Sequence, residues 1–340
     1  MMDRNRAQHD VTVAEEFLEK IQTERRKAKI IDLAPSSTLF LMIVLMSIFI
    51  EGFFTTSNFI SILNQIASPL VLAIGLTFVI LLGSIDLSVE GVMGFTGSIV
   101  TLLVLNNKTS YDLGVWGIFL SVSAGTLVGV FTGLLHVKLR IPSFIVTFGI
   151  AGIITGFGVL SYRGRPASVL DPLFVKLSQE TVFDVPYLAW FAFLMLLVGY
   201  IIQEYTAFGR HVFAIGENES ILRATGINVD RIKILVFTWC AFCASIAGIF
   251  GAIRLKRGEV IIGEGFLFYT ITAVVVGGTS LSGGKGGVLQ SLVGVLMVTV
   301  IQSSLILLGV NPYIQSAIQG GIIILAVSLT VARGRKFIIK

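Results

Sequence analysis

Residues 64–83 read NQIASPLVLAIGLTFVILLG, a run of 20 residues that contains no charged side chain. An α-helix rises about 1.5 Å per residue, so a run of this length spans about 30 Å, the thickness of the hydrocarbon core of a bilayer. The run therefore predicts a helix that crosses a membrane. It ends before Ser84, where a polar segment with two carboxylates begins.

Comparable apolar runs, most of them of roughly 17 to 23 residues, recur on both sides of this segment. Hydrophobic residues make up 54% of the 340 positions and charged residues only 13%, about half the share in a soluble globular chain. We therefore predict an all-α integral membrane protein, a bundle of about ten transmembrane helices. The expected crossings, of which the third and the eighth are short, lie near 37–54, 64–83, 91–105, 115–136, 143–161, 187–203, 233–253, 267–279, 288–309 and 314–332.

The distribution of basic residues predicts the orientation. With ten crossings, the loops and tails on the side of the two termini carry 18 Lys and Arg, and the opposite loops carry 7. Cytoplasmic loops of membrane proteins are enriched in these residues, so both termini are predicted to be cytoplasmic. The net charge of +5 follows from this asymmetry and requires no nucleic-acid partner.

Three parts are expected along the chain: a cytoplasmic N-terminal segment (1–34), a transmembrane domain (35–332) with a cytoplasmic loop (204–233), and a cytoplasmic tail (333–340). The N-terminal segment carries seven Lys or Arg and no apolar stretch before a small-residue cleavage site, so we expect no cleaved secretory signal. Within it, Val11–Ile30 is expected to form a surface helix, either on the membrane or in water.

Small residues four apart within the apolar runs predict closely packed helices, because they share a helix face and let two backbones approach. They occur at Gly125, Gly129 and Gly133, at Gly152 and Gly156, and at Ala247 and Gly251. Cys240 and Cys243 also lie within an apolar run, without the further ligands that zinc requires. We expect both thiols to be small buried packing groups.

The longest polar stretch between apolar runs is the loop 204–233, near the middle of the chain. It predicts a short helix in which Asn218 is the N-cap, Glu219 and Ser220 form the first turn, Arg223 comes late and Gly226 ends the helix. A capped helix in such a loop is either a linker or a docking element for a soluble partner.

Asp86 and Glu90 interrupt the apolar pattern, with no basic residue nearby in the sequence. Four residues apart on one helix they would repel each other, so a break or a helix start is expected here, where free backbone N–H groups can meet them. Three roles remain open for Asp86: fixing the break, lining a solute path, or proton coupling. Glu90 is expected at the interface between the membrane and water, with its side chain in water.

The glycine-rich segment 277–287 does not match a phosphate-binding loop, because Thr279 stands where glycine is required and Gly286 where a hydroxyl residue is required. We expect an irregular, flexible turn between two helices and no bound nucleotide. Only three histidines are present, and no catalytic or metal-binding motif is found. An intramembrane enzyme is therefore a weak alternative, and no cofactor is expected.

Two short segments are similar to segments later in the chain. GSIDLS (83–88) resembles GGTSLS (277–282), and IPSFI (141–145) resembles NPYIQ (311–315). The members of the two pairs are 194 and 170 residues apart, and the difference is about the length of one helix. This similarity indicates a possible internal repeat, which is common in transporters.

A series of motifs in order resembles the ribose-type permeases of bacterial ABC sugar importers, over roughly residues 53–330. The matching segments are TSNFISILNQ (56–65), AIGLTFVI (73–80), IDLSV (85–89), LRIPSFI (139–145), FGRHVFAIGEN (208–218), GINV (226–229), VVVGGTSLSGGKG (274–286) and LGVNPY (308–313).

The resemblance implies a transport subunit of the bacterial inner membrane rather than an enzyme. It implies a second permease chain, identical or different, that encloses one path together with this chain for a small sugar-like solute. It further implies a cytoplasmic ABC ATPase that supplies the energy and a periplasmic binding protein that delivers the solute.

The resemblance also implies roles for three groups of residues. The ATPase-coupling element would comprise Gly209, Arg210, Ala214, Gly216, Asn218, Glu219, Arg223 and Gly226. The translocation path or helix break would involve Asn64, Gln65, Asp86 and Ser88. Docking of the binding protein, guided by charge, would use Arg163, Arg165, Arg254, Lys256 and Arg257.

The chain departs from the family pattern at four positions. Glycine is usual where Ser84 and Glu90 stand, and acidic residues are usual where Leu267 and Tyr269 stand. Such departures are expected if the chain transports a different solute, or if it is the paralogous partner of a second permease chain. The main alternative function is an ion-coupled secondary transporter that uses Asp86 as its titratable group.

Overall fold

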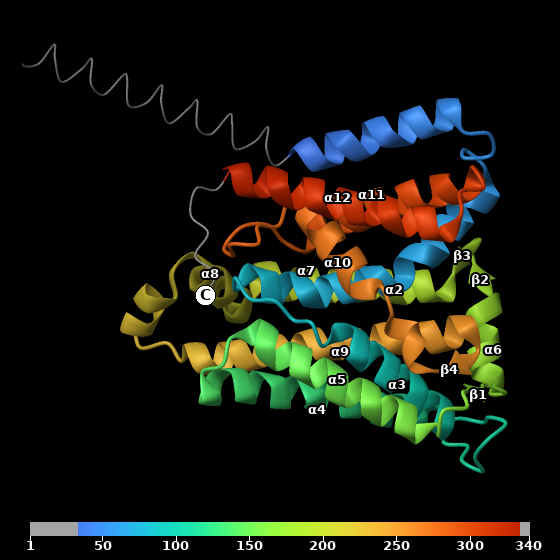
Figure 1. Ribbon diagram of the computed structural model, residues 1–340, viewed down its shortest axis with the longest axis horizontal. Coiled ribbons are helices and arrows are strands. Elements are labelled where there is room, and N and C mark those ends of the chain that lie inside the picture. Colours follow the sequence, from blue (N-terminus) through green and yellow to red (C-terminus); the bar gives the residue numbers. More distant parts are fainter. Residues whose placement is uncertain (1–32, 334–340) are drawn as a thin grey trace, which may run out of the picture.

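A computed structural model describes residues 33–333 and shows a bundle of long helices that lie side by side (Figure 1). The apolar helices are Leu33–Phe49, α2 (Thr56–Leu81), α3 (Val89–Leu103), α4 (Val115–Leu139), α5 (Ser143–Ser161), α7 (Tyr187–Tyr205), α9 (Val229–Leu255), α10 (Phe266–Val276), α11 (Val288–Leu307) and α12 (Pro312–Arg333). The elements between them are β1 (Ala167–Ser168), α6 (Pro172–Gln179), β2 (Thr181–Val182), β3 (Val185–Pro186), α8 (Ala207–Ala224), β4 (Arg257–Gly258) and the 3₁₀ turn η1 (Val260–Gly263).

Each of the ten predicted apolar runs coincides with one of these helices, and 143–161 coincides with α5 residue for residue. Among residues 33–333, six helices are long and apolar enough to cross a membrane: α2, α4, α5, α7, α9 and α11. Leu33–Phe49 and α3 are shorter apolar helices, and so is the continuous stretch Val260–Val276 that contains α10. The all-helical bundle is thus confirmed, and the number of ten crossings stays a prediction.

Helices α2 and α9 form the centre of the bundle. Helix α9 packs against α2, α3 and α4, and α2 packs in addition against α7, α10 and α11. A side chain at Gly75 of α2 would place its Cβ 2.7 Å from the Cβ of Cys243, so glycine on one helix and a small thiol on the other allow the close approach. Both Cys240 and Cys243 are buried, as predicted.

The glycines of α4 confirm the packing prediction. A Cβ at Gly125, Gly129 or Gly133 would lie within 3 Å of an atom of α9, so the two helices are in direct contact over about two turns. For Gly152 and Gly156 of α5 the predicted contact is not found among residues 33–333, where an added Cβ would meet nothing within 4 Å. Helix α5 lies at the side of the bundle, so spacing alone did not reveal which small faces are covered.

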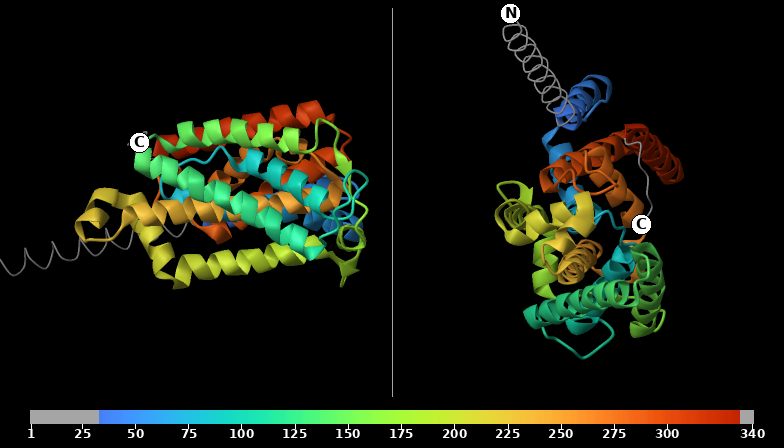
Figure 2. Two further views of the ribbon diagram at one scale, coloured as in Figure 1. Left: turned by 90° about the horizontal axis from the view of Figure 1, so that it is seen from below. Right: turned by 90° about the vertical axis from the view of Figure 1, so that its left-hand side faces the viewer.

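The two ends of the bundle differ. Helix α8 protrudes at one end, and α6 with the short strands covers the other (Figures 1 and 2). The strand pairs are antiparallel, with Ala167 opposite Gly258 in β1–β4 and Thr181 opposite Pro186 in β2–β3. The first apolar helix begins and α12 ends at the α8 end, as an even number of traverses requires. The proposed surface helix Val11–Ile30 and most of the tail 333–340 lie outside the described residues.

Candidate functional site

The predicted break between α2 and α3 is an extended segment that packs along the first turns of α5. The amide of Ile85 donates to the Ser143 hydroxyl at 3.3 Å, and the amide of Leu87 donates to the Thr147 hydroxyl at 3.0 Å. Two residues of extended chain advance about 6.6 Å and four helical residues about 6 Å, so the two spacings match. The helix thus supplies acceptors to two amides of this extended backbone, as irregular chain embedded in a membrane requires.

Asp86 is buried in this segment and binds its own neighbour. One of its oxygens, Oδ1, accepts from the Ser88 amide at 2.8 Å and from the Ser88 hydroxyl at 2.6 Å. Ser88 is the N-cap residue of α3, so these bonds set the position where α3 begins. Within residues 33–333, Asp86 forms no ion pair with a basic side chain. The local geometry therefore agrees with a role in fixing the break.

Glu90 lies elsewhere than expected. Its side chain is half-buried rather than in water, and its Oε1 accepts from the Leu267 amide at 2.8 Å. Leu267 is in the first turn of α10, so a carboxylate of α3 satisfies a free N–H group and lies at the positive end of that helix dipole. Glu90 thereby links the two shortest apolar helices that the structure places in the bundle. Sequence spacing could not show this contact, because 177 residues separate the partners.

Asn64 and Gln65 are not brought together with Asp86. The Gln65 amide group donates to the hydroxyl of Ser61 on the same helix at 3.0 Å. The break begins after Leu81, the last residue of α2. Gln65 lies sixteen residues before Leu81, about 24 Å along the helix. These two polar residues and the break therefore form separate parts of the molecule.

The polar stretch 204–233 contains more helix than predicted. Helix α8 begins after Thr206, whose hydroxyl accepts from the Gly209 amide at 3.2 Å, and has a kink at Asn218 (φ −160°, ψ 97°). The half of α8 before Asn218 was missed, although Thr206 is a typical N-cap residue. Beyond the kink the prediction is confirmed: the Asn218 side chain accepts from the Ile221 amide at 3.3 Å, and Gly226 follows with φ +84°.

Gly216 is the point at which α8 touches the rest of the bundle most closely. A Cβ there would lie 1.9 Å from the Leu81 carbonyl oxygen at the end of α2 and 2.4 Å from the Gly284 amide nitrogen in the glycine-rich turn. The Gly284 amide itself donates to the Leu81 oxygen at 2.9 Å. Even a methyl group at this position would therefore require one of these backbones to shift. Three elements distant in sequence meet here: α8, the end of α2 and the turn between α10 and α11.

The glycine-rich turn is irregular, as predicted, with positive φ angles at Gly278, Gly283, Gly284 and Gly286. A second contact joins its far end to the start of α8. The Gln203 side chain, near the end of α7, accepts from the Val288 amide at 2.7 Å, and a Cβ at Gly209 would lie 2.0 Å from the Gln203 carbonyl oxygen. Arg210 and Ala214 lie on α8 between the contacts at Gly209 and Gly216.

Ionic contacts hold the second half of α8 against the start of α9. Glu219 pairs with Arg223 at 3.0 Å and with Lys233 at 2.8 Å, and Arg223 also pairs with Asp230. Burial would raise the pKa of the Glu219 carboxyl, but the hydrogen bonds from Lys233 and Arg223 outweigh it, so this pKa lies below its ordinary value. Bonds to Asp230 and then Glu219 raise the pKa of the Arg223 guanidinium.

Five basic residues that were assigned to docking gather at the opposite end, where β1 and β4 join their two segments and Ser168 lies opposite Arg257. Arg163, Arg165, Arg254 and Arg257 are exposed, and Lys256 is half-buried. Glu259 pairs with Arg257 at 3.3 Å and reduces the local charge. No group of three or more His, Cys, Asp or Glu side chains suited to a metal occurs between residues 33 and 333.

Comparison with known families decides the class of the protein. Residues 58–327 match the family described as "Branched-chain amino acid transport system / permease component". The chain belongs to this family. It is therefore a permease subunit of a transport system, a multi-pass protein of the inner membrane and not an enzyme, as the motifs indicated.

Individual relatives of the permease are similar over most of its length. It is 32% identical to the ribose import permease protein RbsC of Escherichia coli (strain K12), over 85% of this chain and 90% of that protein. It is 31% identical to the L-arabinose ABC transporter permease protein AraH of Azospirillum brasilense, over 83% of this chain and 82% of that protein. It is 29% identical to the D-allose transport system permease protein AlsC of E. coli (strain K12), over 86% of this chain and 90% of that protein. No solved structure matches the chain.

Proposed function

We propose that this permease imports a monosaccharide-like solute as one of two membrane subunits of an ABC importer. The relatives named for ribose, arabinose and allose support a sugar as the solute class. Ten helices cross the membrane in this proposal, with both termini and α8 in the cytoplasm, an orientation supported by the excess of Lys and Arg on that side.

Helix α8 is the contact to the ATPase in this proposal. The observation that carries it is the close packing at Gly216, because α8 protrudes from the bundle and yet touches backbone atoms of Leu81 and Gly284 directly. A displacement of α8 by a soluble partner would directly displace the end of α2 and the turn between α10 and α11, because their backbones are in contact with α8 at Gly216. The ionic contacts of Glu219 and Arg223 stiffen the same element, so that it acts as a rigid lever.

The opposite end receives the binding protein. The exposed arginines near β1 and β4 would pair with acidic residues on the binding protein, which favours encounter and fixes its orientation. Asp86, Ser88 and Glu90 hold the break and the start of α10 in this account, and the two short helices α3 and α10 border the path, as broken helices do in other transporters.

Reconstitution tests the proposal. The permease, its second permease chain if this is different, the ATPase and the binding protein are placed in liposomes, and uptake of labelled ribose, arabinose and allose is measured. We expect uptake of at least one sugar that requires ATP and the binding protein and is inhibited by vanadate. Uptake driven by a proton or sodium gradient without ATP would contradict the proposal and favour a secondary carrier, and turnover of a substrate by the purified chain would favour an enzyme.

A further inference from the structure

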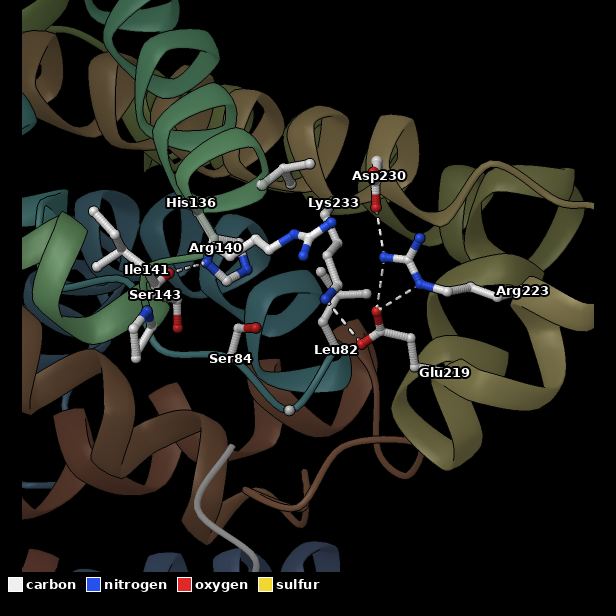
Figure 3. Close-up of a pocket in the computed structure, with 13 residues that line it drawn as sticks. Leu82, Ser84, His136, Arg140, Ile141, Ser143, Glu219, Arg223, Asp230 and Lys233 are labelled. Atoms are coloured by element: carbon white, nitrogen blue, oxygen red, sulfur yellow. Dashed lines mark hydrogen bonds and ion pairs between the residues drawn. The ribbon is translucent and has the colours of Figure 1, made fainter.

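A pocket of about 560 Å³ opens at the α8 end of the bundle (Figure 3). It lies between the ends of α2 and α4 and the starts of α5 and α9, with α8 on its outer side. Because these four apolar helices begin or end at the pocket, it lies at the level where the hydrocarbon region gives way to the headgroups of one bilayer leaflet.

The charges that line the pocket leave one positive charge unbalanced. Lys233 and Arg223 are paired with Glu219 and Asp230, two cations with two anions. Arg140, at the end of α4, has no carboxylate partner among the described residues, and its side chain extends toward the same space as Lys233 (Figure 3). The pocket is therefore suited to a ligand with a single negative charge.

A buried hydroxyl provides a further donor. Ser143 is 7% exposed, lines the pocket and accepts a hydrogen bond from the Ile85 amide, but its own proton has no acceptor among the described residues. His136 has a different role, because its Nδ1 donates to the Ile141 carbonyl oxygen at 2.7 Å and holds the tight α4–α5 turn. A phosphate oxygen in the pocket can accept from Ser143 and from the Arg140 guanidinium.

Apolar side chains continue from the mouth of the pocket along the outer face of α5. Phe144, Ile145 and Phe148 are exposed there, within the first two turns of α5, and Leu139 is exposed at the end of α4. In a chain embedded in a membrane, an apolar surface of this kind is suited to acyl chains. A soluble anion would use only the charged part of the site, whereas a phospholipid would use both parts.

We propose that this pocket binds the phosphodiester headgroup of an anionic phospholipid, with the acyl chains on the apolar face of α5. The single unbalanced charge of Arg140 matches a phosphodiester, the Ser143 hydroxyl orients it, and basic pockets between transmembrane helices are typical sites of such headgroups. Bound lipid would then lie in contact with the Glu219–Lys233 pair that fixes α8. The proposal requires only that the chain is embedded in a membrane.

Native mass spectrometry of the detergent-purified full-length chain tests this site. Phosphatidylglycerol and phosphatidylcholine with the same acyl chains are titrated onto the wild type, Arg140→Gln, and the control Lys138→Gln, an exposed lysine two residues away that does not line the pocket. We expect a preference for phosphatidylglycerol that falls about fivefold in Arg140→Gln, as for one basic residue at a membrane surface, and persists in Lys138→Gln.

A second arm separates lipid from soluble anion. Inorganic phosphate is added as a competitor at constant ionic strength, and thermal unfolding of each variant confirms that it is folded. Equal binding of the two lipids would overturn the proposal, as would equal loss in both variants. Displacement of the lipid by inorganic phosphate at low concentration would also overturn it, because the site would then be one for a soluble anion.

Discussion

The amide of Leu87 donates a hydrogen bond to the hydroxyl of Thr147 at 3.0 Å, across 60 residues of sequence. Thr147 is fully buried, and its hydroxyl is the partner that this extended backbone would otherwise lack. One side chain of α5 thereby stabilises the break between α2 and α3, and with it the position of Asp86.

Replacing Thr147 by valine should destabilise the permease, because the Leu87 amide would remain buried without a partner. The expected loss is about 1–3 kcal/mol in the free energy of unfolding, or of local opening of residues 82–88. Thr147→Ser keeps the hydroxyl and is the matched control. Hydrogen exchange at Leu87 in the purified protein measures the difference, and equal protection in both variants would refute the assignment.

Removing the carboxylate of Glu90 should weaken the start of α10, since the Leu267 amide loses its acceptor and the helix dipole its negative partner. We expect Glu90→Ala to lower the stability by about 1 kcal/mol, as for loss of a helix cap, and Glu90→Gln to have a smaller effect. Exchange of the first-turn amides of α10 provides the measurement. Asp112→Asn, which removes an exposed carboxylate that precedes α4, should have no effect.

The contact between α8 and α9 should depend on pH through Glu219. The pKa of this carboxyl is lower in the folded protein than its ordinary value of 4.5, so its contribution to stability is fully present above pH 4.5 and is lost as the pH falls through the folded-state pKa. The protection of the amides of residues 219–224, corrected for the intrinsic pH dependence of amide exchange, should therefore fall below pH 4.5 and stay constant between that value and neutrality. In Glu219→Gln the exchange should be fast already at neutral pH; a wild-type profile in this variant would show that the ionic contacts do not hold α8.

Asp86→Asn should preserve transport, because the asparagine carbonyl oxygen can accept the same two bonds from Ser88. Asp86→Leu should abolish it by releasing the start of α3. Uptake is measured at several external pH values in both variants. If Asp86→Asn transported but lost a proton dependence that the wild type has, Asp86 would be a coupling residue and the secondary-carrier alternative would be favoured.

The apolar helices and the local caps were predictable from sequence, because both depend on residues close together in the chain. Apolar length located the ten apolar helices, and the cap at Asn218 with the stop at Gly226 lies within nine residues. Nothing local could have revealed the carboxylate of Glu90 at α10 or the path of Ile85 and Leu87 along α5.

Small residues show the same limit. The glycine spacing on α4 and on α5 looks equivalent in the sequence. Among residues 33–333, however, Gly125, Gly129 and Gly133 contact a neighbouring helix and Gly152 and Gly156 do not. Gly216 stands in a polar helix, where glycine usually signals only a weak helix former. Glycine is favoured at this position because the backbones of Leu81 and Gly284 lie directly against it. These residues are 135 and 68 positions away in the sequence, and only the folded chain brings them into contact with Gly216.

The most direct test of the lever account is the number of sugar molecules imported per ATP hydrolysed in the reconstituted importer carrying Gly216→Ala. The added methyl group would clash with the Leu81 carbonyl oxygen, whereas Gly149→Ala, which meets nothing within 4 Å, is the control. The account predicts that Gly216→Ala still assembles and hydrolyses ATP, while uptake per ATP falls at least about tenfold, equivalent to about 1.4 kcal/mol of lost coupling. An unchanged ratio of uptake to hydrolysis, equal to that of Gly149→Ala, would contradict it.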